Sequence, residues 1–168
     1  GPDHNGISTE SLDASLGLSD AWTRNVGTGQ GGVAVRDGLA YVMGGDPTVT
    51  LYCMDALTGA PKWQYSWSSS TPTTTTQWDG DGPRCTPAVQ DGRVYAICQA
   101  GKMYCFNATN GSVVWGPAQV GNAGQEFQAD YGHCGSPLLM NGCLYFNGGT
   151  TGMVVDAATG AVAGGGAI

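Results

Sequence analysis

Basic residues are scarce in this chain of 168 residues. It has 6 lysines and arginines against 13 aspartates and glutamates, which gives a formal net charge of −7. A nucleic-acid-binding protein needs a basic surface to neutralise phosphates, and a negative net charge also disfavours contact with an anionic membrane. The composition therefore predicts a partner that is neither a nucleic acid nor an anionic lipid surface.

Long apolar runs are also missing. No stretch of the sequence approaches the roughly 20 apolar residues that a helix needs to span a bilayer, so we expect no membrane span. The chain begins in the turn-rich segment 1–6, without an initiator methionine or a signal peptide. We expect the start of the protein, with any export signal, to lie upstream of residue 1.

The cysteines and histidines lack the spacing of a metal site. None of the six cysteines forms a CxxC pair and the two histidines lie far apart in the sequence, which disfavours zinc. The even count permits disulfides, and Cys85 and Cys134 could approach each other because they precede the inner strands of adjacent repeats. We expect most of the thiols to be free and to pack as small apolar groups, as at Cys53 and Cys105.

The sequence does contain a threefold repeat of a β-hairpin signal. Each repeat has an alternating apolar strand, a tight turn and a second strand that contains tyrosine. The turn residues are Asp37 and Gly38, Asp91 and Gly92, and Asn141 and Gly142. Such pairs favour a type I′ turn, which needs a positive φ at both positions.

A second hairpin follows each of the first three, so that four short strands recur about every 50 residues, the period and content of a β-propeller blade. A blade must stack between neighbouring blades to bury both of its faces. The fold class predicted is all-β, an incomplete β-propeller of about three four-stranded antiparallel blades. A compact all-β domain with three degenerate repeats is the alternative.

The predicted blades cover residues 31–67, 83–120 and 132–168. The last is incomplete, because the sequence stops at 164–168, where its fourth strand should run. Residues 1–26 form an N-terminal segment in which Trp22 marks the outer strand of a preceding blade. Because about three blades are too few to close a ring, the missing blades of a parent propeller are expected partners.

The second hairpins carry the pattern Asp/Asn-x-x-x-Gly-x-x-x-Trp. It occurs at Asp55, Gly59 and Trp63 and again at Asn107, Gly111 and Trp115. This pattern resembles the tryptophan-docking repeat of pyrroloquinoline-quinone (PQQ) enzymes and of their non-enzymatic relatives, such as the propeller lipoprotein of outer-membrane β-barrel assembly. The resemblance implies that Trp22, Trp63 and Trp115 dock neighbouring blades. In the third repeat, Gly164 stands where tryptophan is expected.

Kelch repeats have a similar period and fit less well. Their Gly-Gly pair is present at 44–45 and 148–149, but the middle repeat has Gln99 and Ala100 there. The acidic-type residue and the tryptophan also lie too far apart for a kelch blade. The PQQ-type repeat is therefore preferred.

Candidate binding residues lie where long loops, at about 66–84 and 116–134, join one blade to the next. Long loops on a rigid scaffold commonly carry binding sites. Arg84, Tyr131 and His133 precede inner strands and are expected to line an axial pocket, where Arg84 could hold a carboxylate or phosphate and His133 could serve as acid, base or ligand. Alternatively, Arg84 bonds carbonyls of neighbouring loops and His133 is a satisfied polar residue at a blade junction.

Two functions follow from the resemblance. The first is a non-catalytic scaffold, without a cofactor, that binds a protein, peptide or carbohydrate through its axial loops in the periplasm or outside the cell. The second is a fragment of a PQQ- and calcium-dependent dehydrogenase, which implies a calcium set, a catalytic aspartate and, in many such enzymes, adjacent cysteines. No catalytic residue or calcium set is recognisable, Asp79 and Asp81 are better explained by a turn, and no Cys-Cys pair occurs. A sugar-processing enzyme is less favoured, because Glu10 and Glu126 form no paired-carboxylate motif.

Overall fold

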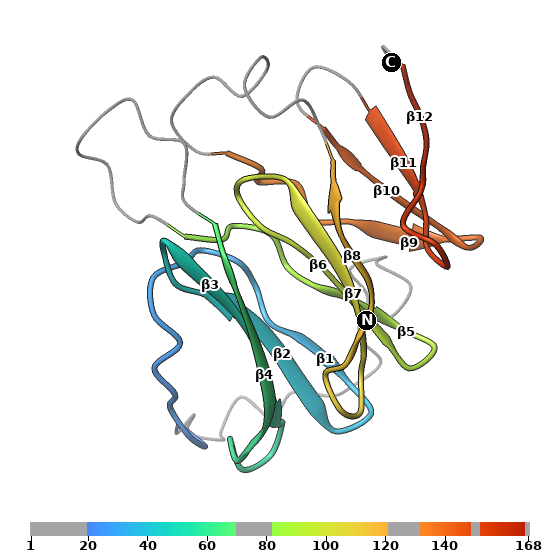
Figure 1. The fold of residues 1–168 in the computed structure, drawn as a ribbon. Coiled ribbons are helices and arrows are strands. Elements are labelled where there is room, and N and C mark those ends of the chain that lie inside the picture. The colour runs from blue at the N-terminus through green and yellow to red at the C-terminus, as the bar shows by residue number, and fades with distance from the viewer. Residues whose placement is uncertain (1–19, 70–81, 121–131, 149–151, 167–168) are drawn as a thin grey trace, which may run out of the picture.

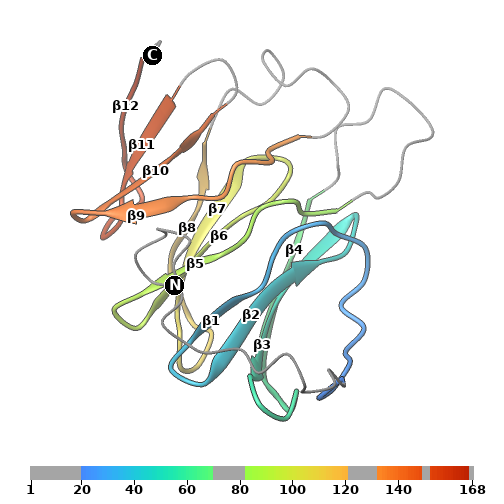
Figure 2. The ribbon, with the colours of Figure 1, turned by 180° about the vertical axis from the view of Figure 1, so that it is seen from behind.

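The computed structural model describes residues 20–69, 82–120, 132–148 and 152–166. Within these ranges the chain forms three four-stranded antiparallel sheets (Figures 1 and 2). The first sheet contains β1 (Ala34–Arg36), β2 (Leu39–Gly44), β3 (Thr48–Asp55) and β4 (Pro61–Ser68). The second contains β5 (Ala88–Gln90), β6 (Arg93–Ile97), β7 (Lys102–Asn107) and β8 (Val113–Gln119). The third contains β9 (Leu138–Met140), β10 (Cys143–Asn147), β11 (Gly152–Asp156) and β12 (Val162–Gly166).

Each sheet is a meander whose spatial order follows the sequence, as in propeller blades. The first turn of each meander has the predicted geometry, because Asp37 and Gly38 have φ values of +51° and +75°. The equivalent values are +51° and +71° at Asp91 and Gly92, and +51° and +75° at Asn141 and Gly142. The all-β prediction and the three type I′ hairpins are therefore confirmed.

The sheets pack face to face through aromatic side chains. On β4, Tyr65 lies with its ring centroid 5.1 Å from that of Phe106, and Trp67 lies 5.0 Å from Tyr104. Tyr104 and Phe106 belong to β7 of the second sheet and are buried. Aromatic burial of this kind is a large source of stability, so the junction between the first two sheets is a central part of the core.

The third sheet has a fourth strand, contrary to the expectation that the sequence stops before it. Strand β12 pairs with β11, and Gly164 lies opposite Val154. Trp63 and Trp115 hold the same place opposite Cys53 and Cys105. Glycines weaken a strand, yet their N–H and C=O groups still form ladder hydrogen bonds, which explains how this glycine-rich stretch completes the sheet.

The segment before β1 lies against the first sheet (Figure 1). Gly45, just after β2, donates its N–H to the carbonyl oxygen of Thr28 at 2.6 Å. In the described parts of the chain, no helix could cross a bilayer.

Candidate functional site

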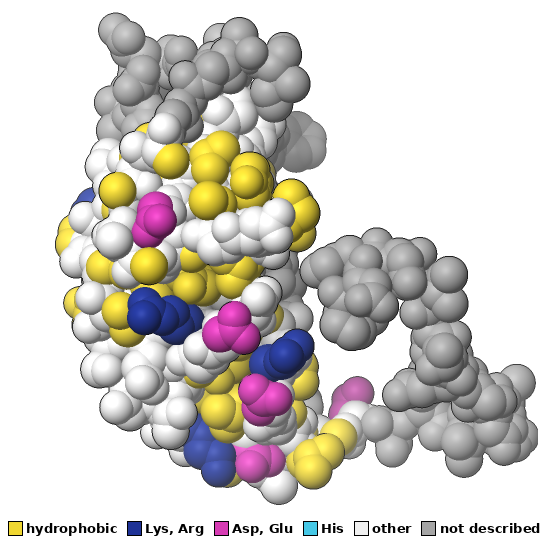
Figure 3. All heavy atoms as spheres, turned by 90° about the vertical axis from the view of Figure 1, so that its right-hand side faces the viewer, with side chains coloured by type: hydrophobic (Ala, Val, Ile, Leu, Met, Phe, Trp, Pro, Cys, Tyr) yellow, Lys and Arg dark blue, Asp and Glu magenta, His cyan; other side chains and the backbone are white. Residues whose placement is uncertain are grey.

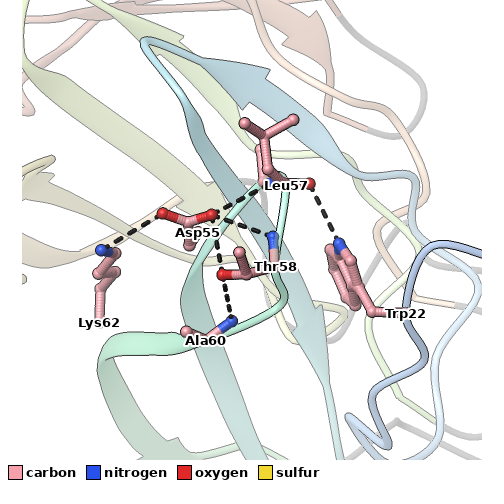
Figure 4. Close-up of polar contacts among 7 residues, drawn as sticks. Trp22, Asp55, Leu57, Thr58, Ala60 and Lys62 are labelled. Atoms are coloured by element: carbon pink, nitrogen blue, oxygen red, sulfur yellow. Dashed lines mark hydrogen bonds and ion pairs between the residues drawn. The ribbon is translucent and has the colours of Figure 1, made fainter.

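The turn between the last two strands of each sheet is built around one acceptor side chain. Asp55 Oδ1 accepts the N–H groups of Leu57 (3.1 Å) and Thr58 (3.0 Å) and the Thr58 hydroxyl (3.0 Å), as Figure 4 shows. These hydrogen bonds, those of Thr58 foremost, lower the pKa of the Asp55 carboxyl. Gly59 then donates its N–H to the Asp55 carbonyl and turns the chain with a φ of +68°.

The same turn occurs in the other two sheets. Asn107 accepts the N–H groups of Thr109 and Asn110 at 2.9 and 3.2 Å. Asp156 accepts the N–H and hydroxyl of Thr159 at 2.8 and 2.7 Å. An amide oxygen therefore replaces the carboxylate in the middle sheet, which shows that this turn requires an acceptor oxygen but no charge.

Each turn carries a tryptophan from the preceding part of the chain. Trp63 of the first sheet donates its indole N–H to the carbonyl oxygen of Ala108 in the second sheet at 2.9 Å. A Cβ atom on Gly111 would lie only 2.5 Å from Trp63 Cε3, so the ring lies directly on the glycine. Any residue larger than glycine at position 111 would require the indole of Trp63 to shift.

The contact recurs at both neighbouring turns. Trp22 donates to the carbonyl oxygen of Ala56 at 3.1 Å (Figure 4), and Trp115 donates to that of Ala157 at 3.0 Å. Cβ atoms on Gly59 and Gly160 would lie 2.6 Å from Trp22 and Trp115. The three tryptophans named from the sequence thus occupy equivalent positions, each on the glycine of a later turn.

The entrances of the inner strands are also joined, by the hydroxyl groups of Thr86 and Ser136. Gly32 donates its N–H to Thr86 Oγ1 at 3.0 Å, and Thr86 donates its N–H to Ser136 Oγ at 2.8 Å. Thr86 and Ser136 each precede a proline, Pro87 or Pro137. A hydroxyl residue followed by proline therefore marks the start of two inner strands.

Arg84 lies at this end of the sheets and is partly exposed. Its guanidinium donates to Gln30 Oε1 of the segment before the first sheet. Its positive charge also lowers the pKa of the Cys134 thiol, although burial has the larger effect and raises it. Arg84 therefore joins neighbouring segments and keeps part of its surface accessible, a geometry in which it could also meet an anionic group.

His133 is only 1% exposed. Its Nε2 lies 3.0 Å from the carbonyl oxygen of Val120, and its backbone N–H donates to the carbonyl oxygen of Gln99 at 2.9 Å. Burial lowers the pKa of the ring to about 4, so the imidazole is neutral at pH 7. The ring is placed as a polar group of the sheet junction, while Tyr131, the third predicted site residue, lies outside the described residues.

The segments that carry Arg84 and His133 run beside each other. Cys85, next to Arg84, donates its thiol to the carbonyl oxygen of His133 at 3.4 Å. All six cysteines are free thiols, and Cys53, Cys85, Cys98 and Cys105 are buried. Burial raises the pKa of Cys85 to about 12, which makes this thiol a poor nucleophile at neutral pH.

A calcium-dependent enzyme would need clustered oxygen ligands. Within residues 20–69, 82–120, 132–148 and 152–166, no three His, Cys, Asp or Glu side chains are arranged to hold a metal ion. Asp79 and Asp81 lie outside these ranges. The described residues therefore do not fit the calcium set implied for a PQQ dehydrogenase, and we assign no catalytic step to them.

Comparison with known families gives one match over most of the chain. Residues 12–166 match the family described as outer membrane protein assembly factor BamB. Among curated proteins, none matches the sequence.

Solved structures share the fold at low sequence identity. A europium-containing methanol dehydrogenase has a TM-score of 0.63 and 21% identity over 86% of this chain and 26% of its own. Quinohemoprotein alcohol dehydrogenase ADHIIG from Pseudomonas putida HK5 has a TM-score of 0.56 and 22% identity, over 84% of this chain and 21% of its own. The computationally designed protein Ika4 has a TM-score of 0.56 and 12% identity, over 90% of this chain and 80% of its own. The chain thus spans about a quarter or less of the two dehydrogenases, and the likeness concerns the fold.

Proposed function

The chain belongs to the family of the outer membrane protein assembly factor BamB, and we propose that it is a non-catalytic propeller scaffold that binds a partner through the loops at the axial end of its sheets. The observation that carries this proposal is how the repeated side chains are used. The turn acceptors, the tryptophans and the inner-strand hydroxyls are all engaged in contacts within or between sheets. Side chains engaged in this way stabilise the scaffold, so we assign recognition of a partner to the loops.

The loops begin and end at fixed points. Ser69 donates its N–H to the carbonyl oxygen of Pro47, and Val120 donates to that of Gly101. The connections that follow run through 70–81 and 121–131, outside the described residues, and the chain returns at Gly82 and Gly132. Rigid anchors of this kind suit binding loops, which are commonly carried on a rigid scaffold.

We take a protein or peptide as the partner, with a carbohydrate as the alternative. The family description concerns protein assembly at the outer membrane, which favours a protein partner and a periplasmic or extracellular location. Arg84 is the proposed recognition residue, because a partly exposed guanidinium binds carboxylates in a bidentate manner. His133 and Tyr131 complete the proposed site, with His133 acting by holding the segment beside Cys85 in place.

Trp22, Trp63 and Trp115 are proposed to dock successive blades at 31–67, 83–120 and 132–168. Each indole lies on a glycine and donates to a carbonyl oxygen of the following unit. The function of these contacts in the scaffold is to set the spacing between the loops of neighbouring blades.

Binding can be tested with immobilised protein and two sets of probes, peptides copied from outer-membrane β-barrel proteins and a glycan array. We expect the peptides to bind, and Arg84→Glu to weaken that binding by roughly tenfold, about 1.4 kcal/mol. Arg24→Glu, a matched change at an exposed arginine of the N-terminal segment, should have no effect. A folded protein that binds neither set, or that loses binding equally with both variants, would contradict the proposal.

Titration calorimetry with PQQ, with and without calcium, tests the enzyme alternative separately. Calcium-dependent PQQ binding in the micromolar range would overturn the scaffold proposal. For a non-catalytic scaffold we expect no heat of binding when PQQ is titrated into the folded protein, with or without calcium.

A further inference from the structure

The thiols are nucleophilic side chains that neither the turns nor the indole contacts use. Among the described residues visible in Figure 3, lysine, arginine, aspartate and glutamate side chains are interspersed, without a large patch of one sign on this face. Two of the thiols, Cys85 and Cys134, belong to the segments that lead into the inner strands β5 and β9. A covalent bond between them would join the second sheet to the third.

The two segments are in contact on both sides of Cys134. Cys85 donates its thiol to the carbonyl oxygen of His133 at 3.4 Å. The next residue, Thr86, donates its N–H to Ser136 Oγ at 2.8 Å. In Figure 2 the chain leading into β9 runs next to the chain leading into β5. Because positions 133 and 136 flank Cys134, these contacts hold Cys134 beside Cys85.

The preceding pair of inner-strand entrances shows how closely such segments approach. A Cβ atom on Gly31 would lie 2.5 Å from the carbonyl oxygen of Cys85 and 3.5 Å from the carbonyl carbon of Arg84. Counted from the hydroxyl contacts at the inner strands, Gly31 corresponds to Cys85, and Arg84 corresponds to Cys134. The side chain of Cys85 is therefore directed at the backbone of Cys134.

The two thiols differ in access to solvent. Cys85 is 0% exposed, so a dissolved reagent does not touch it in the folded protein, whereas Cys134 is exposed. Burial raises the pKa of Cys85 to about 12, and negative charge on Cys134 adds to this rise, as expected of neighbouring thiols. Cys134 is thus the thiol that meets a reagent, and Cys85 is the thiol that a neighbouring sulfur reaches.

The other four cysteines are arranged differently, and all six lie in the described ranges. Cys53, Cys105 and Cys143 belong to strands of three different sheets, β3, β7 and β10. Cys98 is buried, and its sulfur lies 3.0 Å from Ser69 Oγ. The pair at the inner-strand entrances therefore differs from the rest by combining an exposed thiol with a buried thiol on the adjoining segment.

We propose that Cys85 and Cys134 form a disulfide, with a low-molecular-weight disulfide such as oxidised glutathione as the oxidant. Once Cys134 loses its proton, its thiol no longer donates to the carbonyl oxygen of Gly132 at 3.4 Å, and its sulfur attacks one sulfur of the oxidant. The S–S bond of the oxidant breaks, and one glutathione leaves as a thiolate and takes up a proton.

Cys85 completes the exchange. It gives its proton to solvent, and its sulfur attacks the sulfur of Cys134 and expels the second glutathione thiolate, which is then protonated. The two protein thiols lose two electrons and two protons in total, and the oxidant gains them as two molecules of glutathione.

The bridge closes residues 85–134 into a loop that contains the whole second sheet. A cross-link of this kind limits the conformations of the unfolded chain, so the oxidised protein should be harder to unfold. Disulfides persist in oxidising compartments, which fits the proposed periplasmic or extracellular location. The cross-link needs no partner at the loops and stands whether or not the loops bind a peptide.

Peptide mapping of the 168-residue chain tests the pair. The reduced, folded protein is incubated with oxidised glutathione, blocked with N-ethylmaleimide and digested without reductant. We expect two peptides joined through Cys85 and Cys134. Glutathione retained on Cys134 without joined peptides would overturn the proposal, as would joined peptides that form only in urea.

Two variants and a matched control assign the roles of the two thiols. Cys85→Ala should stop the reaction after the first step and keep glutathione on Cys134, whereas Cys134→Ala should leave Cys85 unmodified. Cys143→Ala, at a partly buried cysteine of β10, should form the bridge as the unmodified protein does. Glutathione on Cys85 in folded Cys134→Ala would contradict the proposed order. Circular dichroism checks folding, and mapping of the unmodified protein decides the question if Cys85→Ala does not fold.

Thermal unfolding of the oxidised and reduced protein shows whether the folded state accepts the bridge. Closing a loop of this length should raise the unfolding temperature by roughly 5–10 °C. The rise should disappear on addition of a reductant and be absent in Cys134→Ala. A bridged protein that unfolds at or below the temperature of the reduced protein would show that the bridge distorts the sheet junction, and would overturn the proposal.

Discussion

The indole N–H of Trp63 donates to the carbonyl oxygen of Ala108 at 2.9 Å, across the junction between the first and second sheets. The same oxygen accepts the hydroxyl of Tyr41 at 3.2 Å. The N–H of Ala108 in turn donates to Gly92 of the hairpin turn in its own sheet at 2.9 Å. One backbone unit therefore connects the hairpin, the Asn107 turn and the preceding sheet.

Replacing Trp63 separates the two parts of its contact. Trp63→Phe removes the hydrogen bond but keeps a ring, and should lower the free energy of unfolding by about 1 kcal/mol. Trp63→Ala also removes the packing on Gly111 and should cost about 3 kcal/mol. Urea unfolding of both variants measures the difference, and equal losses would contradict a contribution from the ring.

Gly111 and Gly92 form a matched pair for testing the close approach of tryptophan. Both have a positive φ, +72° and +71°, so alanine at either position costs about 1–2 kcal/mol in backbone strain. Only at Gly111 would the new methyl group meet the ring of Trp63, whereas nothing lies within 4 Å at Gly92. Gly111→Ala should therefore be more destabilising by roughly 1–3 kcal/mol in denaturant unfolding. Similar values would show that the indole moves away freely.

The hairpins and the tryptophan positions could be predicted because their causes are local. Asp37 and Gly38 predict a turn, because aspartate tolerates a positive φ and glycine, which has no side chain, adopts it without steric cost. The spacing from Asp55 to Trp63 repeats at Asn107, and repetition identifies a unit even when its contacts are unknown. The sequence predicts an incomplete last blade because it stops at 164–168, where the fourth strand should run. The strand at 162–166 forms nevertheless, because ladder pairing depends on the neighbouring strand more than on the weak strand preference of glycine.

The partners of these side chains could not be predicted. The indole acceptors are the carbonyls of Ala56, Ala108 and Ala157, and a backbone carbonyl has no sequence signature. Arg84 and His133 both precede inner strands and look alike by position. Their difference in burial arises from packing between segments distant in sequence, so the sequence left both alternatives open for each.

Ser136 should contribute to stability through its hydroxyl. Ser136→Ala leaves the N–H of Thr86 without its acceptor at 2.8 Å, and a lost hydrogen bond of this kind costs about 1 kcal/mol. Ser136→Thr retains the acceptor and should unfold close to the unmodified protein. Thermal unfolding compares the two, and a stable Ser136→Ala variant would indicate that water replaces the hydroxyl.

His133 should make stability depend on pH between about 4 and 6.5. Burial depresses the pKa of the folded state to about 4, below the ordinary value of 6.5. The unfolded chain therefore binds more protons in this window, and the free energy of unfolding should rise with pH by no more than about 3 kcal/mol. The stabilisation that the neutral His133 ring contributes is fully present above pH 6.5 and is lost as the pH falls to 4.

His133→Gln retains a donor for Val120 but does not titrate, so its unfolding free energy should be flatter between pH 4 and 6.5. Asp55 and Asp156, whose pKa values are lowered from 3.8, lose their contribution to stability below about pH 5 in both proteins, so the difference between the two proteins is attributed to His133. Urea titrations at half-unit pH steps measure the slope. The same slope in both proteins would assign the dependence to other groups.

Cys134 should be the first thiol to react in the folded, reduced protein. It is the exposed cysteine, whereas Cys53, Cys85, Cys98 and Cys105 are buried and Cys143 is partly buried. Burial raises the pKa of the Cys134 thiol and the charge of Arg84 partly offsets that rise. Because the thiolate is the reactive form, Arg84→Gln should slow the labelling of this residue. Peptide mapping after timed iodoacetamide treatment identifies each site. Labelling of Cys85 before Cys134 would mean that the contact between Cys85 and the carbonyl of His133 opens readily in solution.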